Sequence, residues 1–216
     1  MECVLCQSSQ PAFFQVIKKP ERNYYHCPDC DVIFMSPEQR LSLHEEKARY
    51  DLHQNDGQEG HQAFLAPLVE DVLTSLTQQG RDLQSVQVLD FGCGPLPALA
   101  VMFAHRGVSV TNYDIFYRPD QDSLRRNYHA ITSTEVWEHL AQPREEISRL
   151  VRMLRNDGIL AVMTSSHKGE AAFHDWHYRR DTTHVVFYSE KTMLWIARKF
   201  NLSLLKAKSP YWIFKK

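Results

Sequence analysis

The chain has 216 residues, of which 43% are hydrophobic and 24% charged, and its formal net charge is -1. This length allows one sizeable α/β domain with a small additional unit, and a near-neutral chain has no global basic field that would indicate nucleic acid binding. The longest apolar runs are too short to span a bilayer, and the N-terminus lacks the pattern of a secretory signal. We therefore expect a cytoplasmic protein with no membrane association, in which paired cysteines bind metal more often than they form disulfides.

Four of the five cysteines lie near the N-terminus, in two C-x2-C pairs that are well separated from each other. Each pair can wrap a tight turn that presents two thiolates, and two such turns complete a tetrahedral ligand set for Zn2+. The predicted ligands are Cys3, Cys6, Cys27 and Cys30. We predict a structural zinc ribbon over residues 1–38, with hairpin strands near 13–17 and 24–26, because four cysteine ligands leave no coordination position open. The alternative is four reduced cysteines without metal. A redox C-x-x-C motif needs only one pair and so does not explain the second.

The remainder of the chain changes from a polar segment to alternating helices and strands. Residues 39–60 are hydrophilic and predict a linker that contains some helix, and residues 61–79 have apolar side chains at helical spacing, with Pro67 as a kink or an early residue of that helix. Further elements are predicted as strands over 86–91, 108–113, 128–132 and 159–164, helices over 96–105, 143–154 and 189–200, and a closing hairpin over 202–206 and 211–215. This order indicates an α/β fold with a doubly wound, mainly parallel sheet, which binds ligands at the carboxyl ends of its strands. The charges between 145 and 155 are expected on a solvated helix face.

The turn after the first strand of this region reads Asp-Phe-Gly-Cys-Gly-Pro-Leu-Pro over residues 90–97. It lacks the Gly-Lys-Ser/Thr ending of a phosphate-binding P-loop and the third glycine of a dinucleotide fingerprint. Gly92 and Gly94 allow the backbone to approach a ligand closely, and Asp90 before the turn favours a cationic group. Asp114 follows at the end of the next strand, where an acid accepts both hydroxyls of a ribose. A ligand with a ribose, a positive charge and no phosphate is S-adenosylmethionine.

The order strand, Asp-x-Gly-x-Gly, helix, strand, Asp resembles motifs I and II of class I S-adenosylmethionine-dependent methyltransferases, and segments 131–140 and 154–163 resemble their motif IV and post-IV regions. The whole chain resembles a group of bacterial zinc-ribbon methyltransferases. The resembling segments are the paired cysteines, Tyr50-Asp-Leu-His-Gln-Asn-Asp and Trp176-His-Tyr-Arg-Arg-Asp-Thr-Thr-His-Val. Two departures are a short gap between Asp114 and the next strand and His129 at a position where the family often has an acid.

The resemblance implies a Rossmann-like methyltransferase domain over residues 61–216, a linker or lid over 39–60, and the ribbon over 1–38. It implies a cofactor site formed by Asp90, Phe91, Gly92, Cys93, Gly94, Asp114, Ile115, Thr134 and Glu135. Tyr50, His53 and Asn55 precede the core and can fold over the cofactor. The expected cofactors are S-adenosylmethionine and structural Zn2+.

Methyl transfer is an in-line displacement from an already activated sulfonium, so the enzyme mainly aligns the nucleophile, and a base is needed only when the acceptor is protonated. The catalytic candidates are His53, Tyr178, Asp181 and His184. Aromatic faces at 176 and 178 can surround the methylsulfonium or the acceptor. The alternatives are a solvated His53, a capping Asp181, a packed His184 and aromatic residues at the edge of the core. Glu135 and His139 either contact the ligands or pack, and a second metal among the histidines and acids of 174–184 is disfavoured because their spacing fits no helical ligand pair.

The sequence favours a small-molecule acceptor, because the net charge is near zero and no long basic run occurs. RNA is the alternative acceptor, which the ribbon would grip with a basic patch. The candidates for that patch are Lys18, Lys19, Arg22, Arg118, Arg125, Arg126, Arg179 and Arg180. A third hypothesis is a non-catalytic cofactor-binding module that recruits a protein partner through the ribbon.

Overall fold

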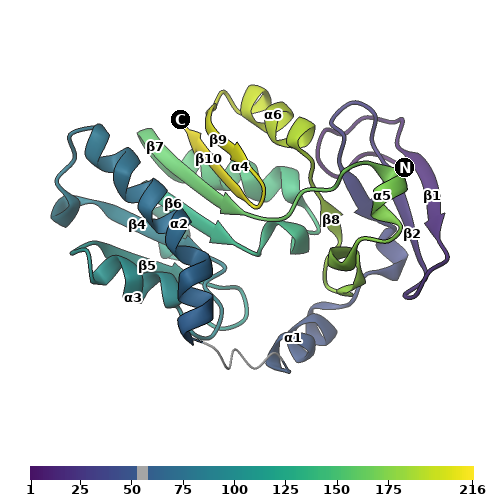
Figure 1. Ribbon diagram of the computed structural model, residues 1–216, viewed down its shortest axis with the longest axis horizontal. Coiled ribbons are helices and arrows are strands. Elements are labelled where there is room, and N and C mark those ends of the chain that lie inside the picture. Colours follow the sequence, from purple (N-terminus) through teal and green to yellow (C-terminus); the bar gives the residue numbers. More distant parts are fainter. Residues whose placement is uncertain (53–57) are drawn as a thin grey trace.

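The computed structural model describes residues 1–52 and 58–216, which form a six-stranded and a four-stranded sheet (Figure 1). The strands of the larger sheet are β4 (Gln87–Phe91), β5 (Ser109–Tyr113), β6 (Tyr128–Thr134), β7 (Leu154–Met163), β9 (Ser203–Lys208) and β10 (Tyr211–Lys215). They lie in the order β5-β4-β6-β7-β10-β9. The first four run parallel, while β10 is antiparallel to both of its neighbours. The sheet confirms the predicted Rossmann-like α/β fold.

Helices cover both faces of this sheet, because its buried strands have apolar side chains on both sides. On β7, Ile159, Ala161 and Met163 belong to one apolar cluster, and Leu160 and Val162 belong to another. The first cluster contains α2 (Gln58–Gln78) and α3 (Ala98–Ala104), and the second contains α4 (Pro143–Met153) and α6 (Glu190–Lys199). No helix within the described ranges is both long and apolar enough to cross a membrane.

Two predicted element boundaries differ from the structure by three residues or more. The helix α2 begins at Gln58, so Pro67 lies inside it. β7 begins at Leu154, several residues before the predicted start, because Leu154 already pairs with Tyr128 of β6. The predicted charged face between 145 and 155 is partly covered, as described below, although α4 itself ends close to its predicted position.

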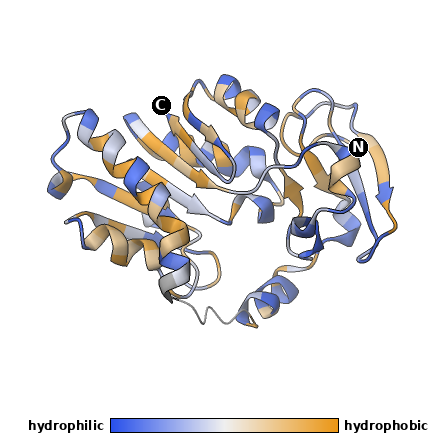
Figure 2. Cartoon of the chain, in the orientation of Figure 1, coloured by the Kyte–Doolittle hydropathy of each residue, from blue (hydrophilic) through white to orange (hydrophobic). Residues whose placement is uncertain are grey.

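The N-terminal unit is a four-stranded sheet with the order β1-β2-β3-β8. Its strands are β1 (Ala12–Val16), β2 (Arg22–His26), β3 (Ile33–Met35) and β8 (Val186–Phe187). β8 comes from the second half of the chain and pairs with β3 in antiparallel register. The rings of Phe14 and Tyr24 pack edge-on against Phe173, the last residue of the short helix α5 (Glu170–Phe173). The cysteine-rich segment therefore shares a hydrophobic core with one face of the large sheet (Figure 2).

Buried polar side chains also join the two units. The Arg179 guanidinium is 1% exposed and donates hydrogen bonds to the backbone carbonyls of His174, Pro20 and Lys18. Asp31 follows the second cysteine pair and accepts a hydrogen bond from the Ser189 hydroxyl at the start of α6. Because a buried guanidinium requires hydrogen-bond partners, the Arg179 contacts specify how the first hairpin packs against the rest of the chain.

The segment between the two units contains α1 (Leu43–Asp51), which begins with a capping box formed by Ser42 and Glu45. The helix has no buried residue and is predominantly hydrophilic (Figure 2). It lies below the space between the four-stranded sheet and the β5 edge of the large sheet (Figure 1). The residues His53 and Asn55, which the sequence assigned to a lid, lie outside the described residues.

Candidate active site and metal centre

The glycine turn between β4 and α3 is closely fitted to its neighbours. Gly92 has φ of 81°, and a Cβ atom built on it would lie 2.2 Å from Val136 Cγ2. The backbone N–H groups of Gly92 and Cys93 donate to the Tyr113 carbonyl at 2.8 and 3.1 Å, which attaches the turn to the end of β5. Gly94 also has a positive φ, of 64°, but nothing lies within 4 Å of its Cβ position. The turn therefore requires glycine at 92 for both conformation and space, and leaves room beside 94.

Asp114 connects this turn to the loop after β5. Its Oδ2 accepts a hydrogen bond from the Gly94 N–H at 2.9 Å, and its Oδ1 accepts from the N–H groups of Phe116 and Tyr117 at 2.8 and 3.0 Å. The side chain lines a cavity even though the residue is only 8% exposed. Each carboxylate oxygen can accept two hydrogen bonds, so Oδ1 is already satisfied, and Oδ2 can accept one more from a ligand hydroxyl.

Asp90 lies beneath the turn, at 2% exposure, and is not among the residues that line the cavity. Its Oδ1 accepts a hydrogen bond from the Thr132 hydroxyl at 3.1 Å. Burial raises the pKa of the Asp90 carboxyl to about 7, against the opposing effect of the Thr132 hydrogen bond. Cys93 and Thr134 do not line the cavity either. Their assignment as cofactor contacts stays a prediction.

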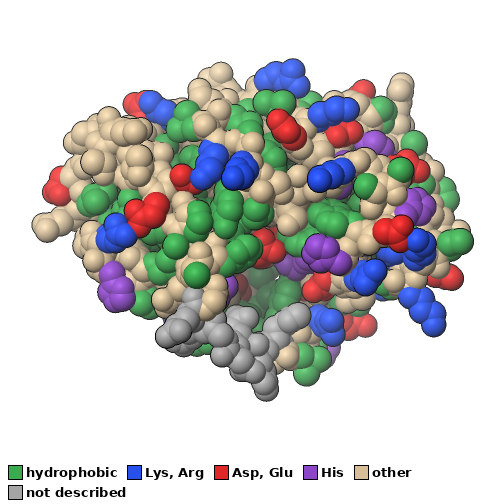
Figure 3. Space-filling view, viewed as in Figure 1, with side chains coloured by type: hydrophobic (Ala, Val, Ile, Leu, Met, Phe, Trp, Pro, Cys, Tyr) green, Lys and Arg blue, Asp and Glu red, His purple; other side chains and the backbone are tan. Residues whose placement is uncertain are grey.

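The cavity has a volume of about 510 Å³, which is in the range of small-molecule sites. Five segments bound it: the glycine turn, the loop after β5, the stretch from Glu135 to Gln142 that contains the 3-10 turn η4 (Trp137–His139), α4 at Glu146 and Arg149, and α1. Asp181 and His184, which precede β8 in the chain, complete the lining. Figure 3 shows the hollow near the lower centre of the view, with histidine and acidic side chains at its rim.

The helix α1 forms one wall of this cavity. Its Tyr50 hydroxyl donates to Glu46 Oε1 at 2.7 Å, and the Tyr50 ring packs edge-on against His139, with ring centroids 5.4 Å apart. The Tyr117 hydroxyl, from the loop after β5, donates to Asp51 Oδ1 at 2.8 Å. These contacts hold α1 against the opening, where the sequence predicted Tyr50 to lie.

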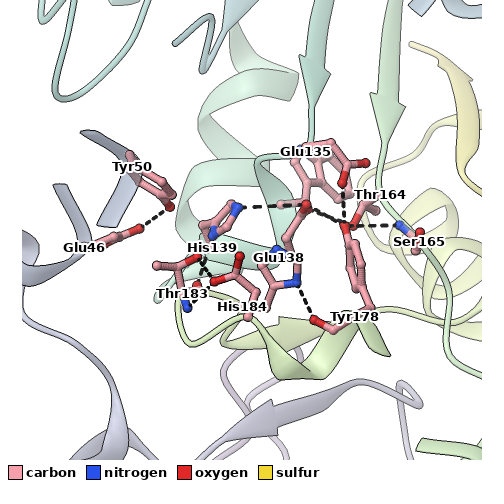
Figure 4. Close-up of polar contacts among 12 residues, drawn as sticks. Glu46, Tyr50, Glu135, Glu138, His139, Thr164, Ser165, Tyr178, Thr183 and His184 are labelled. Atoms are coloured by element: carbon pink, nitrogen blue, oxygen red, sulfur yellow. Dashed lines mark hydrogen bonds and ion pairs between the residues drawn. The ribbon is translucent and has the colours of Figure 1, made fainter. Parts of the chain in front are cut away.

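A buried carboxylate cluster adjoins the cavity through Glu135, which lines it, whereas Glu138 does not (Figure 4). Glu138 is 0% exposed, and its two oxygens accept hydrogen bonds from the hydroxyls of Tyr178, at 2.5 Å, and Thr164, at 2.9 Å. The Tyr178 oxygen also lies 3.1 Å from Glu135 Oε2. Because one hydroxyl proton cannot be donated to two carboxylates, one of these contacts requires a protonated carboxyl. Burial raises the pKa of Glu138, and burial together with the Glu138 charge raises the pKa of Glu135.

Two histidines face this cluster with defined orientations. Nδ1 of His139 lies 3.0 Å from the Thr183 carbonyl oxygen, and Nδ1 of His184 lies 2.7 Å from the Tyr178 carbonyl oxygen. The two rings meet edge to face, with centroids 4.7 Å apart. Since a carbonyl oxygen only accepts hydrogen bonds, each Nδ1 must carry a proton and donate it. In the neutral rings, the lone pair is then at Nε2.

Asp181 is positioned beside the histidines by hydrogen bonds to its own chain segment. Its Oδ1 accepts from the Thr183 backbone N–H and hydroxyl at 3.0 and 2.7 Å. Although burial opposes it, these hydrogen bonds and the neighbouring His184 and His139 lower the pKa of Asp181. The structure thus brings together Tyr178, Asp181 and His184, three of the four residues that the sequence assigned to catalysis.

Other cavity residues had no such signal in the sequence. Glu46 was part of the predicted linker, and Glu146 and Arg149 were expected on a solvated face of α4. Glu146 and Arg149 instead line the cavity, with 3.4 Å between Arg149 Nη1 and Glu146 Oε2. A solvated ion pair on a helix has the same spacing. Only the tertiary arrangement therefore distinguishes a solvated ion pair from cavity-lining side chains.

The four N-terminal cysteines converge in a separate place. The Sγ atoms of Cys3 and Cys30 are 3.6 Å apart, those of Cys6 and Cys27 are 3.4 Å apart, and all four lie within 4.8 Å of one another. A tetrahedral zinc with Zn–S bonds of about 2.3 Å places its sulfurs about 3.8 Å apart. The positions of the thiols therefore fit a structural zinc ion.

The backbones of the two cysteine pairs are alike, which is a second indication of a metal site. The residue after each pair, Gln7 or Asp31, has a positive φ, of 65° and 61° respectively, and its N–H donates to the carbonyl of the first cysteine. In both turns the N–H of the first cysteine donates to a carbonyl just beyond the pair, at Ser8 or Val32. The N–H groups of Cys6 and Ser8 additionally point at thiol sulfurs, at 3.5 Å each. Two matching turns of this kind suit thiolate ligands.

Comparison with known proteins adds evidence on the family and the fold. Residues 38–207 match the model of a family described as a methyltransferase domain. None of the curated proteins matches the sequence. Among solved structures, the chain is similar to 1,6-didemethyltoxoflavin-N1-methyltransferase of Burkholderia thailandensis, bound to 1,6-didemethyltoxoflavin and S-adenosylhomocysteine, with 15% identity, a TM-score of 0.57, and coverage of 96% of this chain and 99% of that chain. It is also similar to magnesium protoporphyrin IX methyltransferase of Synechocystis PCC 6803 with bound S-adenosylhomocysteine, with 17% identity, a TM-score of 0.50, and coverage of 82% of this chain and 87% of that chain.

Proposed function

We propose that this chain transfers the methyl group of S-adenosylmethionine to a small-molecule acceptor. The chain belongs to the methyltransferase family whose domain model matches residues 38–207. The observation that carries this proposal is the position of Asp114, which joins the glycine turn to the loop after β5 at the mouth of a cavity of about 510 Å³. The two similar structures, whose names specify small substrates, support an acceptor of the same class.

The cofactor side of the cavity fits S-adenosylmethionine. Asp114 Oδ2 would accept a hydrogen bond from a ribose hydroxyl, and the open space beside Gly94 would allow close approach of the cofactor. Ile115 and Phe116 line the same side and offer apolar contact for the base. When bound, the cofactor supplies a methyl group already activated on a sulfonium. The residues of this chain then have to orient the acceptor and exclude water.

The acceptor side is polar, with Glu135, His139, Asp181 and His184 on the cavity wall. A hydroxyl or amine acceptor would find a proton acceptor at either imidazole Nε2, which carries the lone pair in the neutral rings described above. Tyr178 is held neutral, because burial and the charges of Glu138 and Glu135 raise its pKa far above the ordinary value. We therefore assign it a positioning role, as a hydroxyl donor to the carboxylates. His53 stays a prediction from the sequence.

Cofactor binding is the first test. We expect Asp114→Ala to weaken S-adenosylmethionine binding by about 1.5–3 kcal/mol, the value of hydrogen bonds to a charged group, or roughly 10- to 150-fold in Kd. Asp120→Ala is the matched control, because that residue is an exposed aspartate of the same loop. Isothermal titration calorimetry measures both. Equal affinities for wild type and Asp114→Ala would remove Asp114 from the site.

The acceptor class is tested with tritiated S-adenosylmethionine, purified protein and fractionated lysate, with Asp114→Ala as the inactive reference. We expect label in the small-molecule fraction. Label in RNA would instead favour the alternative function, which a second hollow lined by Arg125, Arg126 and Arg152 supports because arginines at one place can bind phosphates. Cofactor binding without label in any fraction would favour a binding module without catalysis.

The N-terminal cluster is proposed to hold one structural zinc per chain on Cys3, Cys6, Cys27 and Cys30. The spacing of the Sγ atoms and the two matching turns support this assignment. Elemental analysis of the purified protein should give about one zinc more in the wild type than in Cys6→Ser. A wild type that contains no zinc and takes up none would overturn the assignment.

A further inference from the structure

A second group of side chains with converging donor atoms lies at the cavity wall, where His139 and His184 line the cavity and Glu138 is fully buried. One carboxylate oxygen of Glu138 and one imidazole nitrogen each of His139 and His184 lie within 4.8 Å of one another, and apart from the cysteines no other such group occurs among the described residues. We propose that these three side chains bind a divalent transition-metal ion that positions the methyl acceptor. This inference rests on the proposed methyltransferase function, whose acceptor it specifies further.

The tautomers of both histidines suit metal binding. His139 donates its Nδ1–H to the Thr183 carbonyl and His184 donates its Nδ1–H to the Tyr178 carbonyl. Histidine ligands characteristically donate the other ring N–H to a carbonyl or carboxylate, which fixes the ring and places the lone pair on the ligating nitrogen. The same backbone segment, residues 178–184, thus orients both imidazoles so that Nε2 is the ligating atom.

The carboxylate is held equally firmly. Hydrogen bonds from Tyr178 and Thr164 reach the two oxygens of Glu138, which has no exposed surface. His139 Nε2 lies 4.0 Å from Glu138 Oε1. Ligand bonds of about 2.0–2.2 Å place two donors on one ion up to about 4.2 Å apart, so this distance already fits. A metal ion would also stabilise the charged form of this buried carboxylate.

The ligand types and their surroundings indicate the kind of metal and its task. Two imidazoles and one carboxylate suit Zn2+, Fe2+ or Mn2+ better than Mg2+ or Ca2+, which prefer oxygen ligands. Three protein ligands leave coordination positions open, and His139 and His184 both line the cavity, so those positions face the proposed acceptor. The site therefore favours a hydroxylated small molecule that coordinates the ion through oxygen.

The consequence for the reaction is a defined nucleophile. With both Nε2 lone pairs on the metal, the imidazoles cannot also accept the proton of the acceptor. A metal-bound hydroxyl is more acidic than a free one, so in this arrangement the acceptor hydroxyl would lose its proton to water instead. The oxygen forms a bond to the methyl carbon while the bond between that carbon and sulfur breaks. The electron pair of the broken bond remains on sulfur and neutralises the sulfonium. No oxidant, reductant or further reactant is needed.

Metal stoichiometry tests the proposal without reference to activity. Protein is first loaded with one equivalent of Zn2+ to fill the cysteine cluster, because thiolates select zinc over manganese. Mn2+ is then added, and its free fraction is followed by electron paramagnetic resonance. We expect one bound Mn2+ per wild-type chain and at least a tenfold weaker Kd in His184→Ala and in His139→Gln. His105→Ala, which changes an exposed histidine at the end of α3, should bind like the wild type.

The controls separate failure of this site from failure of the proposed function. Circular dichroism and S-adenosylmethionine binding are measured on every variant, so a misfolded His184→Ala is recognised and His139→Gln then decides. Wild-type protein that binds S-adenosylmethionine but takes up no Mn2+, and no Zn2+ beyond the first equivalent, would overturn the metal site while leaving the methyltransferase proposal intact. Mn2+ binding that is equal in all variants would also overturn it.

Discussion

The two places where potential ligands converge are built in different ways. The cysteine cluster comes from two short turns with the same backbone hydrogen bonds, each of which positions both of its thiols. The cavity takes its side chains from α1, the glycine turn, the loop after β5, the segment around η4, α4 and residues 181–184. The first arrangement depends on local conformation, and the second depends on how distant segments pack. The difference predicts that metal stabilises the cysteine region directly, whereas the geometry of the cavity depends on individual packing contacts.

The largest expected effect follows removal of the zinc that we propose for the cysteine cluster. Treatment with a strong zinc chelator, or the substitution Cys27→Ser, should lower the free energy of unfolding by about 5 kcal/mol or more, because structural zinc sites contribute much of the folding energy of small modules. Since β8 pairs with β3 and the two units share one apolar cluster, the loss of stability should extend to the face of the large sheet that α4 and α6 cover. Chemical denaturation of both forms measures the change.

Cys93→Ala is the control for this experiment, since the fifth cysteine lies in the glycine turn and outside the cluster. With zinc bound, its free energy of unfolding should differ from that of the wild type by less than about 2 kcal/mol. The chelator should then lower the stability of both proteins by the same amount. Identical unfolding curves for the wild type with and without chelator would contradict the comparison, because the ribbon would then be stable through packing alone.

An intermediate effect is expected at the glycine turn. Gly92→Ala should lower the free energy of unfolding by about 2–4 kcal/mol, which combines a left-handed backbone for a residue with Cβ and an overpacked contact with Val136. Gly94→Ala is the matched variant, because Gly94 also has a positive φ but has open space at its Cβ position. This substitution should lower the free energy of unfolding by only about 1–2 kcal/mol. Thermal unfolding compares the two. Equal losses would show that the Val136 contact does not limit the turn.

The same contrast explains what the sequence could predict. The cysteine spacing, the strand–turn–helix pattern and Asp114 are local signals, and the structure confirms the fold class and the positions of most elements they predicted. The pairing of β8 with β3, the burial of Glu138 and the approach of His139 to His184 join residues that are distant in sequence. Glu146 and Arg149 have the spacing of an exposed ion pair, so nothing in the sequence indicated that they line a cavity. Packing between segments, rather than residue type, decides these cases.

The smallest effect concerns the pH dependence contributed by Asp90. Its folded-state pKa is raised to about 7, above an unfolded value of about 3.9. Between these values the folded state binds more protons than the unfolded state, so the free energy of unfolding falls as pH rises through that window and is level above it. Asp90→Asn abolishes this titration and keeps an acceptor for the Thr132 hydroxyl. The stability of the variant relative to wild type should therefore increase by about 2–3 kcal/mol between pH 5 and pH 7.5.

Urea denaturation across this pH range measures the difference, with Asp120→Asn as the control at an exposed carboxylate. The control should show a constant difference from wild type. A constant difference for Asp90→Asn as well would mean that Asp90 is ionised throughout, and therefore that a compensating positive charge reaches it in the folded protein. In that case saturating S-adenosylmethionine, whose sulfonium and amino groups are cationic, should stabilise the wild type more than Asp90→Asn. That result would support the sequence-based assignment of Asp90 to the cofactor site over a purely structural role beneath the glycine turn.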